Sequence, residues 1–85
     1  MATRGIPDVQ FPRPSGWEVR VWYQLGAMHA VMVLNPEGQP IELAGPGEMV
    51  WRGLSQGQVL DVMTRTSQLA ADATDEHAVH VITGR

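Results

Sequence analysis

The stretch GLSQGQV, which begins at Gly53, constrains the fold of this chain of 85 residues more than any other segment does. Ser55 has the side chain of a helix N-cap, because its hydroxyl can accept a backbone N–H from the first turn. Gln58 follows three residues later, where its side chain can bond back to the N–H of Ser55 and complete a capping box. We therefore expect a helix from about residue 56 to about residue 72, with β-like sequence before and after it.

The length of the chain suits one domain with one hydrophobic core. The sequence contains no cysteine, which excludes a disulfide framework and a thiolate metal site. A chain this small must therefore fold by side-chain packing alone or by association with another chain.

The formal net charge is -3, which argues against a general nucleic-acid binder, since such proteins carry a basic surface. No apolar run approaches the roughly 20 residues of a membrane span. Residues 1–16 lack the apolar segment of a secretory signal. We expect a cytoplasmic protein that has no membrane contact.

The sequence contains arginine but no lysine, and Gly, Ala, Pro and Val are abundant. Codons for these amino acids are rich in G and C. This bias indicates a GC-rich genome, such as that of an actinobacterium or its phage, and it says nothing about mechanism.

Residues 1–16 contain Pro7, Pro12 and Pro14. Proline fixes φ, lacks a donor and disfavours helical backbone at the residue before it. We expect an extended or disordered N-terminal arm over residues 1–16, followed by a single α+β domain over residues 17–85.

Several segments of the expected domain have the composition or the alternation of β-strands. In residues 17–24, successive side chains fall alternately on the two faces of a predicted strand. Residues 28–34 are apolar on both faces of a second predicted strand. Gly26 and Ala27 lie between these segments and are expected to form a two-residue hairpin loop. Further short strands are expected over residues 39–44, 48–52 and 77–83, with Gly45-Pro46-Gly47 as a break. The predicted fold is an antiparallel sheet of three or four strands, then one helix on one face, then a final strand.

The predicted hairpin register leaves one face of this sheet uncovered. A two-residue loop places Tyr23 opposite Ala30, and opposed residues share a face. The face away from the helix then carries apolar side chains, which usually mark an interface when they are exposed. The candidate interface residues are Arg20, Trp22, His29, Val31, Val33 and Trp51.

Two other interpretations of this face remain open. The N-terminal arm or residues 45–52 could cover Trp22, since loops close many small sheets. Alternatively, Arg20 and Trp22 could stack on nucleic-acid bases, although the acidic net charge disfavours phosphate binding.

Residues with catalytic or metal-binding chemistry are few. His77 and His80 are three residues apart, so on the expected strand they point to opposite faces and chelate a metal poorly. A lone His29 beside Glu18 or Glu42 does not make a catalytic pocket. We expect no enzymatic activity, no metal and no cofactor.

The sequence therefore predicts a small protein–protein interaction or assembly module. A phage-encoded protein that acts on a host protein is one form of this prediction. A homodimer that stacks the uncovered sheet faces is the simplest form, because most oligomers are symmetric. Nucleic-acid binding is the alternative.

Overall fold

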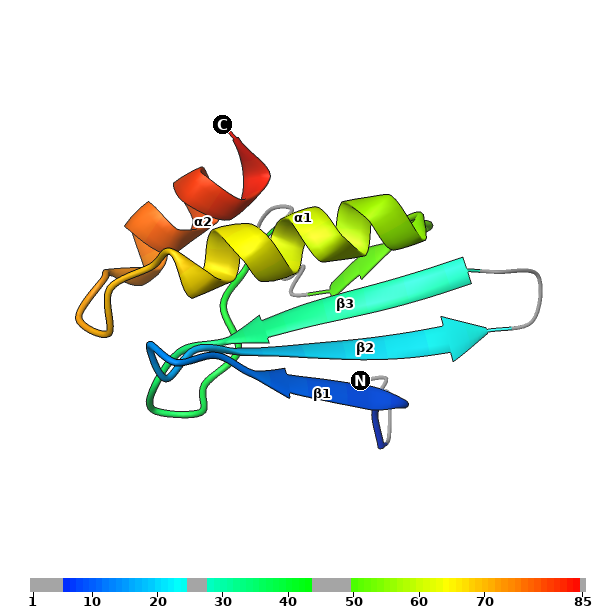
Figure 1. Ribbon diagram of the computed structural model, residues 1–85, viewed down its shortest axis with the longest axis horizontal. Helices are drawn as coiled ribbons and strands as arrows, with labels where there is room; N and C mark the ends of the chain where they lie inside the picture. Colours follow the sequence, from blue (N-terminus) through cyan, green and yellow to red (C-terminus); the bar gives the residue numbers. More distant parts are fainter. Residues whose placement is uncertain (1–5, 25–27, 44–49, 85) are drawn as a thin grey trace.

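The computed structural model describes residues 6–24, 28–43 and 50–84. These residues form an antiparallel four-stranded sheet with two helices on one of its faces (Figure 1), which confirms the α+β class. The strands lie side by side in chain order and are β1 (Val9–Pro12), β2 (Glu18–Gln24), β3 (Met28–Leu34) and β4 (Val50–Arg52). The helices are α1 (Gln56–Ser67) and α2 (Asp75–Thr83).

Strand β1 lies inside the segment that we expected to be a separate arm. It pairs with β2, so that Val9 is opposite Val21 and Phe11 is opposite Val19. Phe11 is half-buried and packs against the core. Pro12 ends the strand at the edge of the sheet, a position that tolerates its missing N–H. The sheet therefore begins before residue 17.

The register of β2 and β3 differs by one residue from the predicted register. Gln24 lies opposite Met28, so three residues separate the strands, and the Gly26–Ala27 turn type lies outside the described residues. Val31 is consequently opposite Val21, and Val33 is opposite Val19. A shift of one residue moves every side chain of a strand to the other face, because side chains alternate with a period of two.

The segment after β3 is not the strand that we expected over residues 39–44. Within the described residues it has a single bridge, between Pro40 and Leu34. Two backbone bonds accompany it, from the N–H of Asn35 to the carbonyl of Gln39 (2.8 Å) and from the N–H of Ile41 to the carbonyl of Val33 (3.1 Å). Proline cannot donate to a ladder, which limits the pairing here. Ile41 and Leu43 are nevertheless buried in the core. The expected break at residues 45–47 lies outside the described residues.

Helix α1 begins where the sequence predicts. The N–H of Gln58 donates to Ser55 Oγ (3.2 Å), and the N–H of Ser55 donates to Gln58 Oε1 (2.8 Å). The helix ends at Ser67, earlier than expected. The indole N–H of Trp17 donates to the carbonyl of Ala70 (3.0 Å), which ties the following turn to the start of β2.

The predicted final strand over residues 77–83 is wrong, because this segment is helix α2. Thr74 is its N-cap and accepts a hydrogen bond from the N–H of His77 (3.1 Å). Asp75 in the first turn complements the positive end of the helix, and Gly84 ends it in the left-handed conformation (φ 75°). The alternation of valines in this short segment resembles a strand, but its two buried residues, Ala78 and Ile82, are one helical turn apart.

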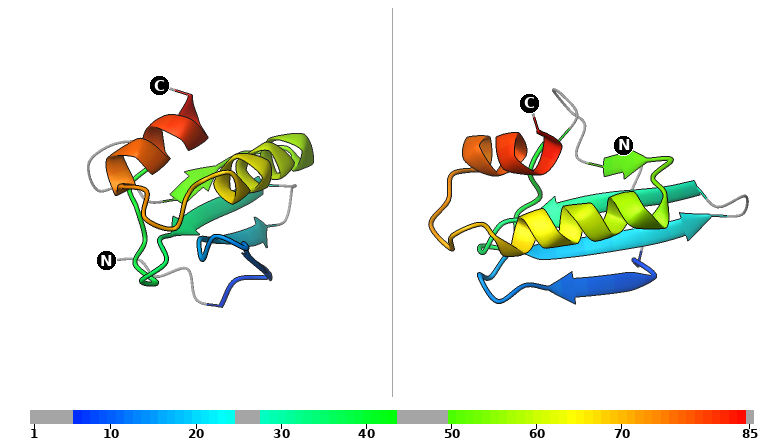
Figure 2. Two further views of the ribbon diagram at one scale, coloured as in Figure 1. Left: turned by 60° about the vertical axis from the view of Figure 1, so that its left-hand side comes forward. Right: turned by 45° about the horizontal axis from the view of Figure 1, so that its top comes forward.

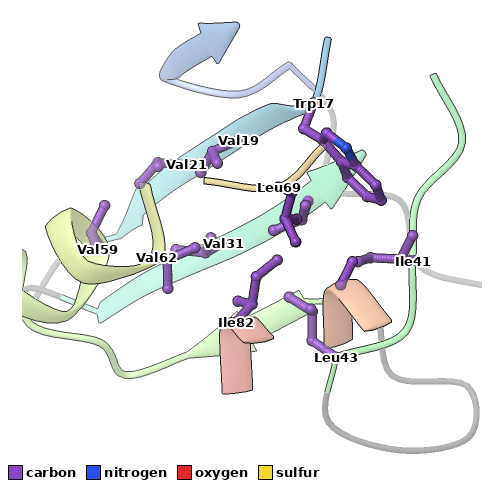
Figure 3. Packing of buried hydrophobic residues seen from close by; sticks show 12 residues of the cluster. Trp17, Val19, Val21, Val31, Ile41, Leu43, Val59, Val62, Leu69 and Ile82 are labelled. Carbon is purple, nitrogen blue, oxygen red and sulfur yellow. The ribbon is translucent and has the colours of Figure 1, made fainter. Parts of the chain in front are cut away.

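The core lies between the sheet and the two helices (Figure 2). Val59 and Val62 of α1 point toward Val21 and Val31 of the sheet (Figure 3). Ile82 of α2 is buried in the same cluster. Two short helices therefore cover the face on which one longer helix was expected. Neither of these helices, within the described ranges, has the length and apolar character that crossing a membrane requires.

Candidate functional site

A pocket of about 320 Å³ opens where β4 meets both helices, and we call it the Trp51 pocket. Its volume is at the lower end of the range for small-ligand sites. Val62 and Ile82 are buried side chains of this pocket, and Trp51 and Leu54 are half-buried. The polar residues that line it are Arg52, Gln58, Asp61, Arg65 and Thr83.

Local structure positions each wall of the Trp51 pocket. Strand β4 pairs with β3, so that Trp51 lies opposite Val31 on the helix-covered face. Gly53 follows β4 with a positive φ of 73°, which favours glycine, and leads directly to the cap of α1. The capping box at Ser55 then fixes the first turn of α1, so that Gln58 and Asp61 lie along one flank of that helix.

Arg65 joins the two helices at the rim of the pocket. Its Nη1 donates to the carbonyl of Ile82 (3.0 Å), near the end of α2. Carbonyl groups in the last turn of a helix lack intrahelical partners and carry partial negative charge, so a guanidinium stabilises them. Asp61, one turn earlier on α1, is exposed and has no ion pair with any described residue.

The structure separates the residues that the sequence analysis grouped as an interface. Val31 and Val33 are fully buried beneath the helices, so their assignment to an exposed surface is wrong. Trp51 is on that same face but remains half-buried at the pocket. Arg20 lies on the opposite face, across from Met32 of β3. His29 is in β3, opposite Tyr23.

Trp22 is on the helix-free face, as expected, but it is only 7% exposed. Its indole N–H is buried and has no hydrogen-bond partner among the described residues. Arg20 on the same face donates through Nε to Glu18 Oε2 (2.7 Å), and both side chains are partly shielded from solvent. This face therefore does not present Trp22 and a free arginine to a partner, and the premise of an apolar, uncovered face is wrong.

Of the residues that line the pocket, Trp51 alone was among the predicted interface residues. Asp61, Arg65 and Gln58 recur at three- and four-residue spacing on α1, which places them on one flank of the helix. Ile82 was assigned to a strand, so its place beside that flank was not foreseen. The helix signals that could have located it are Thr74 before the segment and Gly84 after it.

The expected arrangement of the two C-terminal histidines is also wrong. His77 and His80 lie three residues apart on α2, not on a strand, and both are exposed. Within residues 6–24, 28–43 and 50–84, no three His, Asp or Glu side chains gather closely enough to hold a metal ion. The described lining of the Trp51 pocket contains one carboxylate and no histidine. The lining thus combines buried apolar side chains with exposed polar ones.

No protein-family model, curated protein or solved structure matches this chain.

Proposed function

We propose that this protein is a small, non-enzymatic protein-binding module and that its partner binds at the Trp51 pocket. The observation that carries the proposal is a pocket with apolar side chains inside and charged groups around them, beside a half-buried tryptophan. Interface hot spots have this composition: tryptophan and arginine are enriched, and a polar rim surrounds a well-packed apolar centre.

The proposal changes the surface that the sequence analysis favoured, but it keeps the class of function. The uncovered sheet face is replaced because Val31 and Val33 belong to the core and Trp22 is buried. Nucleic-acid binding through Arg20 and Trp22 is disfavoured by two observations. Trp22 is buried, and Arg20 is paired with Glu18. Trp51 is the predicted interface residue that lines the pocket.

Capture with immobilised protein tests the proposal. Wild-type chain and the variants Asp61→Arg and Asp72→Arg are exposed to a lysate of a GC-rich bacterium. Both aspartates are exposed, so each variant should stay within about 0.5 kcal/mol of the wild-type free energy of unfolding. Asp61 lines the pocket and Asp72 does not, although the charge change is the same.

The expected result is a protein that wild type and Asp72→Arg both retain and that Asp61→Arg loses. Trp51→Ala, checked for folding by circular dichroism, should lose the same protein. Equal retention by all four chains would show that the Trp51 pocket is not the binding surface.

A further inference from the structure

The apolar part of the Trp51 pocket is largely inaccessible in this conformation. Val62 and Ile82 line the pocket but are only 4% and 2% exposed, and Trp51 is half-buried. A partner that recognises these apolar side chains therefore needs one wall of the pocket to move. Ile82 and Thr83 belong to α2, so α2 is the wall whose displacement uncovers the most buried surface.

Helix α2 has a small buried face. Two of its nine residues, Ala78 and Ile82, are buried, and Val79 and Val81 are only half-buried against the core. The helix lies at one end of the molecule (Figure 1), beyond α1 and away from β1. Elements with few buried apolar contacts open locally at a lower free energy than the whole domain requires.

Few side-chain hydrogen bonds attach α2 to other elements. Among the described residues there are two. Asn35 Nδ2 donates to Asp75 Oδ1 in the first turn of the helix, but this contact is long (3.5 Å). Arg65 Nη1 donates to the carbonyl of Ile82 in the last turn at 3.0 Å. The shorter contact, and the one made by a charged donor, is therefore at the pocket.

The segment that precedes α2 separates it mechanically from α1. Leu69 is buried in the core, and the carbonyl of Ala70 accepts the indole N–H of Trp17, so the chain is fixed up to this point. Ala71 and Asp72, which follow, are exposed. A rotation of α2 about residues 71–74 therefore leaves α1 and the bond to Trp17 in place.

We propose that α2 is a lid on the Trp51 pocket, that it opens about residues 71–74 while α1 and the sheet stay folded, and that Arg65 is its latch. This inference rests on the proposed function of the pocket. Opening uncovers Ile82 and also Leu43, which lies beside Ile82 in the core (Figure 3). Binding elements that move are drawn from the least stable parts of a fold. The open form is sparsely populated, so equilibrium unfolding of α2 and of the core still coincides.

Arg65 has the position and the chemistry of a latch. Its guanidinium reaches across to the carbonyl end of α2, where the helix carries partial negative charge. Asp61, four residues earlier on α1, has no ion pair with Arg65. Hydrogen bonds from charged donors are stronger than neutral ones, so loss of this bond should raise the open fraction about tenfold.

Thiol labelling measures the opening directly, because the natural chain contains no cysteine. Ala78→Cys places one thiol on the buried face of α2, and Val21→Cys places one in β2 beneath α1; both positions are fully buried. Each variant is treated with iodoacetamide over a series of urea concentrations below its unfolding transition. The labelling rate follows the fraction of molecules in which the thiol is exposed, provided that closing is faster than labelling.

The two thiols should depend differently on urea. The effect of urea on an opening equilibrium scales with the surface that is exposed. Local opening of α2 exposes little surface, so labelling of the Ala78→Cys thiol should change little at low urea. Labelling of the Val21→Cys thiol requires global unfolding and should rise steeply. This comparison holds even if one substitution lowers the overall stability.

A second substitution tests the latch in the Ala78→Cys background. Arg65→Met should raise the labelling rate at low urea about tenfold, since it removes the bond to Ile82. Arg52→Met is the matched control: Arg52 also lines the pocket and is exposed, but it has no ion pair with any described residue. It should leave the rate unchanged.

An equally steep urea dependence for both thiols overturns the lid, and equal rates for Arg65→Met and Arg52→Met overturn the latch. These failures differ from failure of the proposed function. A chain whose α2 does not open, but which still retains a protein through Asp61, has the Trp51 pocket as a fixed binding surface. A chain whose α2 opens, but which retains no protein through Asp61, has the lid and lacks the proposed function.

Discussion

Trp17, directly before β2, and Trp22, within β2, are both buried, yet their indole N–H groups have different surroundings. The N–H of Trp17 donates to the carbonyl of Ala70, whereas the N–H of Trp22 has no partner in the described part of the chain. A buried donor without a partner destabilises the folded state, and one hydrogen bond contributes about 1 kcal/mol. The two tryptophans should therefore respond differently to the same substitution.

We predict that Trp17→Phe lowers the free energy of unfolding by about 1–2 kcal/mol more than Trp22→Phe does. Trp17→Phe removes a hydrogen bond between the sheet and the turn after α1, while Trp22→Phe removes an unsatisfied donor. Urea unfolding followed by far-ultraviolet circular dichroism measures both values. Equal losses would mean that the bond to Ala70 contributes no stability.

The candidate site shows how much single residues reveal from sequence. Trp51 was among the predicted interface residues, and the structure places it at the pocket. Val31 and Val33 were assigned wrongly because a single residue of register separates the exposed face from the core. Composition alone does not contain that register, since it depends on the number of residues in the turn.

At the scale of elements, the first turn of α1 is the part that the sequence specifies most directly. Both bonds of the capping box involve only Ser55 and Gln58, so no distant residue is needed to form them. Gly57 follows the cap and lowers the intrinsic helix propensity of this turn, which increases its dependence on Ser55.

Ser55→Ala should lower the free energy of unfolding by about 1 kcal/mol, because the N–H of Gln58 loses its acceptor. Ser55→Gly should cost only about 0.3 kcal/mol, since glycine leaves the cap open to water. Thermal unfolding of the two variants beside wild type measures the difference. A glycine variant as unstable as the alanine variant would contradict the role of the cap.

Helix α2, unlike the first turn of α1, depends on contacts with the rest of the molecule. With nine residues, it is shorter than the roughly 12–15 residues at which an isolated helix becomes marginally stable. Its persistence therefore depends on contacts from outside the segment: the buried Ala78 and Ile82, and the bond from Arg65 to the carbonyl of Ile82. A pattern of alternating valines could not reveal these contacts.

At the scale of the whole molecule, one core connects the sheet to both helices. Chains of this size have a free energy of unfolding of roughly 4–13 kcal/mol, so a single core residue can remove a large fraction of it. The small core also implies that α1, α2 and the sheet unfold together.

Ile82→Ala should lower the free energy of unfolding by about 2–5 kcal/mol, because it leaves a cavity among α2, α1 and the sheet. His80→Ala changes an exposed residue of the same helix and should stay within about 0.5 kcal/mol of wild type. Urea transitions measured by tryptophan fluorescence and by helical circular dichroism should coincide in both variants. Separate transitions would show that α2 folds independently of the core.

The sequence by itself determined the α+β class, the start of α1 and the alternation of β2, because each rests on hydrogen bonds or periodicity within a few neighbouring residues. Only the tertiary structure decided the register of β3, the helical state of residues 75–83 and the pocket beside Trp51. Each of these depends on burial against distant parts of the chain. For residues 75–83, Thr74 and Gly84 mark where a helix could begin and end, and the burial of Ala78 and Ile82 selects it.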